Sequence, residues 1–466
     1  MQAPETRNNG FPNQRLISYE ELKQHSSYSD GWIAINGTVY DITNYVAKHP
    51  FGDTFRGNLG TDCTGIFSSA HLHTNVEALL KQDKFLQKND IVVVGTLAPE
   101  NANLHAESDG KFLDRLVYQD TQHDEFWLDL KQRVEAYLVE TGESTHYSTT
   151  EGILLLLYHG SLFLILSYFT WIKLSFLAAI LLSAHMVCAC ASMSHMAAHF
   201  GLTNNQRLNF LSLQFMDLSG FSSLEWQIIH QTHHNQPHSS IDHQTNQYAP
   251  LRIHQYVKWH PHHRYQNRLV WIALPIYHFR SFFMSTVWML QHQNFVRNAQ
   301  EMLAHLLSKL TLISLIVYCG YQYGIGNMAI IFMVYSTAFS FFAFLLLYNN
   351  HEETHHLLSQ EENINPLHQK LPWAEVQVRT SGDWVPTNWL LSFVEFHYGY
   401  FNYHIEHHLF PSFKPILLKK LSPIVRETCQ KHNLPYLSTT FMEVQTSFHR
   451  HLVNMGNSQE TTLKTG

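Results

Sequence analysis

Apolar residues gather in two long blocks along the chain, and the first block predicts a pair of membrane-spanning helices. Residues 153–193 contain a single charged side chain, Lys173, near their midpoint. A helix that crosses a bilayer needs about 20 apolar residues, and this block is long enough for two. We therefore expect spans at about 153–172 and 174–193, joined by a tight turn at Lys173.

The second apolar block, residues 302–348, predicts two further spans. Its first part carries only Lys309, and the part from 326 to 348 carries no charge. Glycine marks turns and helix ends, and three glycines interrupt the block near its middle. We expect the chain to turn there, around Gly320, Gly324 and Gly326.

Two hairpins of this kind place several segments on one side of the membrane. An even number of crossings returns the chain to the same side, so the N-terminus, residues 194–301 and the C-terminus are expected together. Residues 269–290 are also apolar, but they include His278 and Arg280. We interpret this segment as an interfacial or buried cap helix rather than a fifth span.

The remaining pattern predicts the domain organisation. Short β-like runs separated by turn residues indicate a small soluble domain before the first span. Residues 111–140 repeat apolar residues at helical spacing, which is typical of an amphipathic helix or helix pair. We expect, in order, a flexible N-terminus, this soluble domain, a polar linker, a membrane domain and a polar C-terminal tail: residues 1–14, 15–98, 99–110, 111–445 and 446–466.

Composition excludes several classes of protein. Charged residues make up 14% and hydrophobic residues 45% of the chain, against about 25% charged residues in an ordinary soluble domain, so a disordered chain is excluded. A net charge of −7 gives no electrostatic footprint for nucleic acid. The five cysteines form no CxxC pair, which argues against a zinc ribbon or a disulfide framework. The N-terminus lacks the features of a cleavable signal peptide.

Histidine is the outlier, with 34 residues, and four histidine clusters follow the predicted topology. The first, 195–199, begins where the second span ends. The second, 230–234, follows, and the third, 351–356, begins where the last span ends. The fourth, 404–408, lies in the C-terminal part. All four are expected on one face of the membrane.

The spacing within these clusters places imidazoles on one side of a helix, because residues i, i+3 and i+4 share a face. One HxxxH and two HxxHH clusters supply eight imidazoles, and His351 or His355 offers a ninth. A zinc site uses three or four protein ligands, so this set is too large for one metal and suits two. Imidazole binds several transition metals and does not name the metal.

Other polar residues receive plainer interpretations. A single such cluster arises readily by chance in a histidine-rich chain, and the coincidence of four at helix ends is what favours a metal site. Glu406 and Glu225 are candidates for carboxylates that orient an imidazole, and Asp217 is expected at a helix end or on the surface. The other histidines are expected at the surface or in support of the ligands: His238, His243, His254, His260, His262, His263, His292 and His397.

The clusters and the residues around them resemble the membrane fatty acyl desaturases. The match includes Asn350-His351, Trp373 with Gln377 and Thr380, and the specific run HIEHHLFP at 404–411, and it covers most of 150–425. The resemblance implies two iron ions that activate O2 to remove hydrogens from an acyl chain. It implies nine metal ligands, with His355 as the rival of His351: His195, His199, His230, His233, His234, His351, His404, His407 and His408.

One residue departs from the pattern of front-end desaturases, which insert a double bond between an existing one and the carboxyl end. Those enzymes usually carry glutamine as the first residue of the third histidine box, and this chain carries His404. The substitution preserves metal binding and leaves the position of the double bond open.

The N-terminal segment resembles cytochrome b5, a family that holds haem b between two imidazoles. His49-Pro50-Phe51-Gly52-Asp53 matches the first ligand motif, with Phe51 in place of the usual first glycine. Asp62-Cys63-Thr64 with Phe67 and His71 matches the second, although the loop between the ligands is about one residue short. The resemblance implies haem held by His49 and His71, with His73 as the alternative.

Together the resemblances imply a small α+β haem domain followed by an all-α, four-span membrane desaturase domain with a cytosolic helical cap. They imply a desaturase acting on a long acyl chain carried by a lipid or by CoA. Its partners would be O2 and an NAD(P)H-dependent cytochrome b5 reductase, and its expected location is the endoplasmic reticulum membrane with both termini cytosolic. The alternatives are a b5-fused lipid hydroxylase, a sphingolipid desaturase, and a membrane-tethered electron carrier whose histidines only bind metal.

Overall fold

The computed structural model describes most of the chain. The expected N-terminal segment 1–14, nearly all of the expected linker, His73 and His355 lie outside the described residues. These residues are 15–49, 55–72, 76–99, 118, 123–239, 242, 251–253, 258–292, 296, 298–347, 351 and 371–457.

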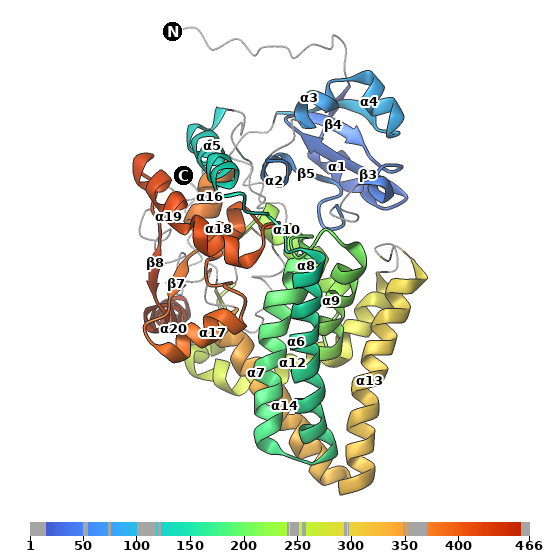
Figure 1. The fold of residues 1–466 in the computed structure, drawn as a ribbon, viewed down its shortest axis with the longest axis vertical. Coiled ribbons are helices and arrows are strands. Elements are labelled where there is room, and N and C mark those ends of the chain that lie inside the picture. Colours follow the sequence, from blue (N-terminus) through green and yellow to red (C-terminus); the bar gives the residue numbers. More distant parts are fainter. Residues whose placement is uncertain are drawn as a thin grey trace.

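A small sheet with short helices forms the N-terminal domain, at the upper right of Figure 1. Its strands lie in the order β1-β6-β4-β3-β2, and β5 pairs with β3. Ile33, Tyr40 and Leu59 contribute to one buried cluster. The elements are β1 Leu16–Ile17, α1 Tyr19–Gln24, β2 Ser26–Ser27, β3 Asp30–Ile35, β4 Thr38–Asp41, η1 Val46–Lys48, β5 Thr61–Asp62, α2 Thr64–Ala70, α3 Val76–Leu80, α4 Asp83–Lys88 and β6 Val92–Leu97.

Four helices among the described residues are long and apolar enough to cross a membrane, which confirms the predicted spans. They run downward together in Figure 1. The first comprises α6 Thr149–Ser167 and the π-helical η3 Tyr168–Ile172; the second comprises α7 Phe176–Ala189, the π-helical η4 Cys190–His195 and α8 Met196–Ala198; the third and fourth are α13 Ala299–Tyr323 and α14 Ile325–Leu346.

The two hairpin turns fall where the pattern predicted them. Lys173 follows η3, and Leu174 takes a positive φ of 55° before α7 begins. Gly324 separates α13 from α14 with φ 83° and ψ 155°, a backbone region that is essentially restricted to glycine. The turn between the last two spans therefore depends on Gly324 alone among the three glycines of that block.

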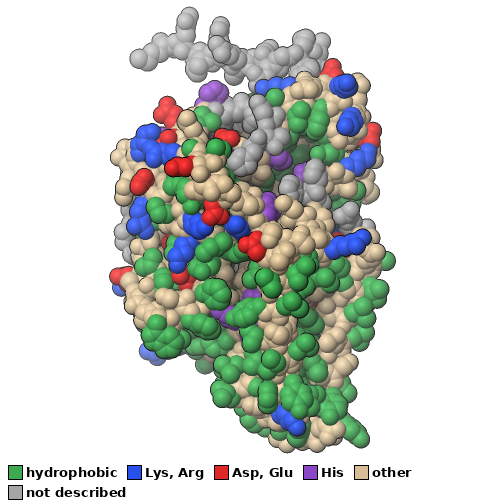
Figure 2. Space-filling model, in the orientation of Figure 1, with side chains coloured by type: hydrophobic (Ala, Val, Ile, Leu, Met, Phe, Trp, Pro, Cys, Tyr) green, Lys and Arg blue, Asp and Glu red, His purple; other side chains and the backbone are tan. Residues whose placement is uncertain are grey.

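Helix α7 is the central helix of the bundle. In the most apolar stretch of the second span, which includes α7, 72% of the residues are buried, against 17% in that of the first span. Helix α7 packs against α14 and α6, and the outward faces of the spans are covered with apolar side chains (Figure 2). Charged side chains gather over the upper part of the molecule in this view, as expected of a bundle surrounded by lipid.

A cap of helices and a two-stranded parallel sheet covers one end of the bundle. Trp127, Leu130, Trp373 and Phe410 belong to its buried core. Its elements are α5 Glu125–Thr141, α9 Gln206–Ser219, α10 Ser223–Asn235, η5 Pro261–Tyr265, α12 Gln266–Gln291, α16 Trp373–Thr380, β7 Asp383–Val385, α17 Trp389–His397, α18 His404–Leu409, α19 Pro415–Lys431, β8 Ser438–Thr440 and α20 Phe441–Asn457.

Two predicted segments are refined by the structure. The apolar segment 269–290 is one helix, α12, which is not among the candidate spans and buries His278 against Ser336 and the carbonyl of Ser219. The predicted start of the tail at residue 446 is wrong, because it falls inside α20. That helix buries Phe448 and Leu452 against the cap, so its apolar face continues the fold to Asn457.

Candidate metal centre

Helix ends carry the clustered histidines to one place at the top of the membrane bundle. His195 ends η4 on the second span, and His199 follows α8. Helix α10 presents three histidines and begins at Ser222, whose hydroxyl accepts a hydrogen bond from the Glu225 N–H. Helix α18 begins at His404, where Asp383 accepts a hydrogen bond from the Ile405 N–H. These three clusters are therefore held by helices.

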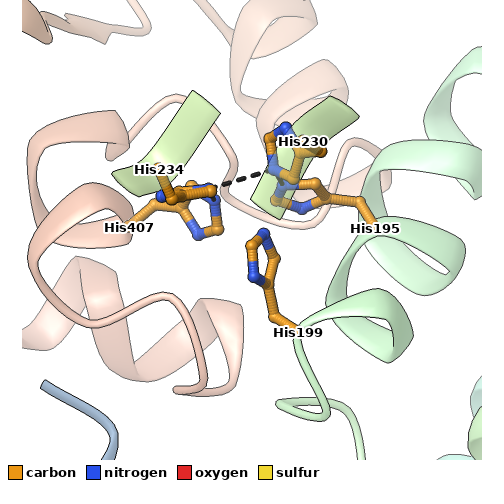
Figure 3. Close-up of side chains that lie close together, drawn as sticks. All are labelled: His195, His199, His230, His234 and His407. Carbon is orange, nitrogen blue, oxygen red and sulfur yellow. Dashed lines mark hydrogen bonds between the residues drawn. The ribbon is translucent and has the colours of Figure 1, made fainter. Parts of the chain in front are cut away.

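Five imidazoles form the first group, which Figure 3 shows pointing toward one another. Their ligand nitrogens all lie within 4.8 Å of one another. Nε2 of His230 lies 2.7 Å from Nε2 of His195 and 3.0 Å from Nε2 of His234. Trp226 stacks on His230 with ring centres 4.1 Å apart. The group consists of His195, His199, His230, His234 and His407.

Four imidazoles form a second group beside the first. Nε2 of His351 lies 2.8 Å from Nε2 of His233, 2.7 Å from that of His404 and 3.1 Å from that of His408. His351, the first residue of its cluster, thus joins two of the histidine boxes, while its rival His355 lies outside the described residues. The nine predicted ligands therefore divide into five and four.

The outward nitrogens of the second group show which ring nitrogens are unprotonated. Nδ1 of His233 lies 2.8 Å from the Asp242 carboxylate, and Nδ1 of His351 lies 2.8 Å from the carbonyl of Thr380. Both partners only accept hydrogen bonds, so each Nδ1 carries the proton and each Nε2 presents a lone pair. Two facing lone pairs 2.8 Å apart repel each other, and a cation between them removes the repulsion.

Several ring nitrogens of the first group are likewise buried, and within the described residues they lack a hydrogen-bond partner. Nδ1 of His195, His234 and His407, Nδ1 of His404 in the second group, and Nε2 of His199 are buried with no hydrogen-bond partner among the described residues. Burial lowers the pKa of His199, His234 and His407 well below the usual value, so these rings are neutral at physiological pH. Neutral imidazoles in such numbers are ligands suited to two transition-metal ions.

The two histidines predicted to hold haem face each other in the N-terminal domain. An imidazole nitrogen bonds a metal at about 2.0 Å, so rings on opposite sides of one metal have centres roughly 6 Å apart. The rings of His49 and His71 have centres 6.2 Å apart. Nδ1 of His71 donates to the carbonyl of Phe67 at 2.9 Å, which leaves its Nε2 for a metal. These two residues fit an axial pair.

Comparison with known protein families decides the kind of protein. The fatty acid desaturase family matches residues 171–440, more than half of the chain. The chain belongs to the fatty acid desaturase family. The cytochrome b5-like haem/steroid-binding domain matches residues 18–95, so this desaturase carries a fused b5-like domain, as the sequence predicted.

Curated relatives resemble this desaturase over nearly its whole length. The acyl-lipid (8-3)-desaturase of Mortierella alpina is 26% identical, with 95% of this chain and 97% of the relative covered. Fatty acid desaturase 3 of Bos taurus is 24% identical, with 95% and 94% covered. The acyl-lipid (9-3)-desaturase of Borago officinalis is 25% identical, with 94% and 93% covered. No solved structure matches the chain.

These findings confirm the predicted fold class, a haem domain followed by four membrane helices, and the predicted enzyme class. The chain is an oxidoreductase of the desaturase family. The family implies iron and the b5-like domain implies haem, and the histidine groups are a site that can hold metal.

Several polar residues of the desaturase lie elsewhere than predicted. Asp217 ends α9 as expected but is buried, where it accepts a hydrogen bond from Nδ1 of His305 at 2.5 Å. The carboxylate of Glu406 accepts from Tyr436 at 2.8 Å. Glu225 interacts with the charges of Arg280 and Lys309. In the described part of the chain, neither glutamate is hydrogen-bonded to an imidazole.

Sequence reasoning missed the carboxylate that does orient an imidazole. Asp242 is fully buried, and its Oδ2 also accepts the N–H of His238 at 2.8 Å. Burial alone would raise the pKa of Asp242, but its interaction with His233 and these hydrogen bonds lower it to about 2. Its position nine residues after His233, in a segment without periodicity, gave no signal. Gln377, part of the family resemblance, accepts from Nδ1 of His408 at 2.8 Å.

Proposed function

We propose that the nine histidines hold two iron ions and that the enzyme introduces a double bond into a long acyl chain carried by a lipid. The convergence of Nε2 atoms at 2.7–3.1 Å around His351 is the observation that supports the metal assignment. Two irons bound there would supply the activation of O2 that removes hydrogens from an unactivated carbon chain.

The surrounding side chains control the ligands and exclude water. Asp242, Thr380 and Gln377 each fix the outward nitrogen of one imidazole, which sets the tautomer and aims Nε2 inward. His233, His407 and His408 are completely buried. A dry and rigid site of this kind protects reactive chemistry from side reactions with water.

The same proposal assigns His49 and His71 as the axial ligands of haem b. A haem there would carry single electrons, and an NAD(P)H-dependent cytochrome b5 reductase would supply them. Four electrons reduce O2 to two waters, and the acyl chain gives up two of them with its two hydrogens. The haem domain must therefore deliver two electrons for each double bond, and two protons come from solvent.

The topology supports a proposed location and orientation. Four spans in two hairpins return the chain to the side of the cap, so both termini and the haem domain would face the cytosol. In that orientation the haem domain would receive electrons from a reductase on the cytosolic side. We place the enzyme in the endoplasmic reticulum membrane. We keep the predicted domain boundaries, except that the tail begins after Asn457.

The carrier of the acyl chain is proposed from the relatives. Two of those compared are named acyl-lipid desaturases, which favours a lipid-linked chain over acyl-CoA or a sphingoid base. His404 lies within the second histidine group. This contact supports a role as metal ligand for the histidine at the first position of the third box.

Lipid profiling of a yeast strain that expresses the enzyme tests the proposal. Cells fed a panel of acyl chains should accumulate a product lighter than its substrate by two hydrogens, recovered from the lipid fraction. A product heavier by one oxygen would instead identify a hydroxylase. The variant His407→Ala should abolish the product while the haem spectrum persists, and an unchanged product would contradict the metal assignment.

A further inference from the structure

The haem domain packs closely against the cap. Helix α2 of the haem domain packs on α10, the helix that carries three predicted ligands. The side chain of Arg56 is only 4% exposed and pairs with Glu301 at the start of α13 at 2.7 Å. This ion pair joins the haem domain to the third membrane span.

Two glycines show how closely the two parts approach. A Cβ on Gly65 would lie 2.1 Å from the ring of Trp373, and a Cβ on Gly57 would lie 2.6 Å from the carbonyl of Ile228. Neither glycine has the positive φ that favours glycine for its own sake. Only the neighbouring cap forbids a side chain at these positions, so the contact itself accounts for both glycines.

Helix α10 is shared between the haem domain and the metal groups. The Gly57 N–H donates to Gln231 Oε1 at 2.7 Å, and the Thr232 hydroxyl donates to the Gly57 carbonyl at 3.0 Å. The Asn235 amide donates to Thr61 Oγ1 at 3.1 Å and to the Asp62 carbonyl at 3.0 Å. Gln231, Thr232 and Asn235 are thus interspersed with the three predicted ligands along α10.

Two connections from α2 lead to one predicted ligand, His408. The Ser69 hydroxyl, 1% exposed, donates to the carbonyl of Leu409 at 2.6 Å, and Leu409 is bonded to His408. Trp373, against Gly65, lies one turn before Gln377, which accepts from Nδ1 of His408. Helix α2 itself ends at His71, a predicted haem ligand.

We propose that the haem domain works in this fixed docked position and that electrons leave it through the contact of Ser69 with Leu409, entering the metal pair at the second histidine group. This inference rests on the proposed function. Each transfer oxidises the haem by one electron and reduces the metal pair by one, and no bond is made or broken. A domain that swings on its linker would need no such fitted surface.

A crosslink tests the fixed position. The variant Thr61→Cys combined with Asn235→Cys replaces two side chains whose polar atoms lie 3.1 Å apart. Because Asn235 is buried, the pair is joined by oxidation to a disulfide bond rather than by an added reagent. The crosslink should form in metal-free protein as well. After photoreduction of the haem, the joined enzyme given O2 and acyl lipid should reoxidise its haem as fast as the unjoined variant. A slower rate that recovers when the disulfide bond is reduced would overturn the fixed position.

A pair of neighbouring serines tests the route. Ser69→Ala should slow haem reoxidation several-fold while the haem spectrum and reduction by the reductase stay normal. Ser68→Ala is the matched control, because the Ser68 hydroxyl accepts from Trp127 and Lys131 of α5, away from the histidines. Equal rates in both variants would overturn the route.

A second pair of variants adds a larger side chain to α2 instead of removing a hydrogen bond. Gly65→Leu places a side chain against Trp373 and should lower both the crosslinking yield and the rate of haem reoxidation. Ala70→Leu adds a side chain at an exposed position of the same helix and should change neither. Normal crosslinking and reoxidation in Gly65→Leu would contradict the docked position. Failure of the unmodified enzyme to reoxidise its haem or to make product would instead reject the proposed function.

Discussion

At the scale of residues, two adjacent histidines serve different metal groups. A helix turns by about 100° per residue, so His233 and His234 point in different directions from α10. His234 joins the first group and His233 the second, and His407 and His408 divide in the same way on α18. The HxxHH pattern is therefore suited to bridging two neighbouring metals from one helix.

Replacement of His351 should remove metal from the second group in particular. Its Nε2 is the common neighbour of three other imidazoles, so His351→Ala should lose about one of the two irons and the desaturated product. Iron analysis of purified protein checks this, with His262→Ala at an exposed position as the control. Full iron content in His351→Ala would reject this ligand.

Asp242 should matter for metal affinity rather than for folding. Asp242→Asn weakens the hydrogen bond that fixes His233, and loss of such a partner typically costs about 10–100-fold in metal affinity. Competition with a chelator measures the effect. The control Asp129→Asn changes a carboxylate of α5 that pairs with Lys431 and His432, neither of which belongs to the histidine groups. Equal affinities in the two variants would exclude the orienting role.

Glu225 should make stability depend on pH. Burial raises its pKa from 4.5 to about 7, although Arg280 and Lys309 act to lower it. The folded protein thus holds a proton that the unfolded chain releases, so the free energy of unfolding should fall as the pH rises from 4.5 to about 7.

The variant Glu225→Gln cannot ionise and should lose this dependence. Its thermal unfolding midpoint relative to the unmodified enzyme should increase across that range, as measured in detergent. Glu140→Gln, at an exposed carboxyl, is the control and should show no such trend. A difference in unfolding midpoint between Glu225→Gln and the unmodified enzyme that stays constant with pH would show that Glu225 does not titrate in this range.

At the scale of elements, the ends of the spans are specialised. The second span changes from α-helix to the π-helical η4 over Cys190–His195, and π-helical turns are often found at functional sites. The wider turn sets the rotation at which His195 leaves the membrane helix. His195 consequently reaches His230 on α10, 35 residues away in the chain.

The turn between α13 and α14 gives an element-scale prediction. Gly324 occupies a backbone region essentially limited to glycine, and a side chain forced into it costs about 1–3 kcal/mol. Gly324→Ala should therefore lower the thermal unfolding midpoint. Gly326→Ala, in open space two residues later without a positive φ, should not. Equal midpoints would show that the turn relaxes to accept a side chain.

At the scale of the whole molecule, apolar and polar surfaces divide along the long axis. The four spans expose apolar side chains. The cap, with the histidine-bearing helices α10 and α18, and the haem domain lie together at one end (Figure 1). Lys173 lies at the opposite end, in the turn between the first two spans. A bilayer across the apolar part separates Lys173 from the haem domain.

Labelling from each side of the membrane tests this orientation. In sealed microsomes, Lys173→Cys should react with a membrane-impermeant thiol reagent only after the membrane is opened. Tags on both termini should be accessible to a cytosolic protease without that step. Labelling of the 173 position in intact microsomes would contradict the four-span arrangement.

The sequence predicted features that depend on neighbours in the chain. The spans follow from the length of the apolar runs and the hairpin turns from Lys173 and the glycines Gly320, Gly324 and Gly326. The candidate ligands follow from i, i+3, i+4 spacing. Asp242 escaped prediction because it lies outside the helix that carries its partner His233. Asp217 lies near a helix end, which is one of its two predicted positions, but its burial depends on packing against α13.

The chain by itself thus determined its membrane spans, its histidine clusters and its haem motif, because hydropathy, length and helical periodicity are local properties. Tertiary structure alone decided that the nine imidazoles divide into five and four, that His351 lies at the centre of the second group, and that α2 rests on α10 and α18. These features depend on the rotation and contact of helices far apart in sequence, which no local pattern specifies.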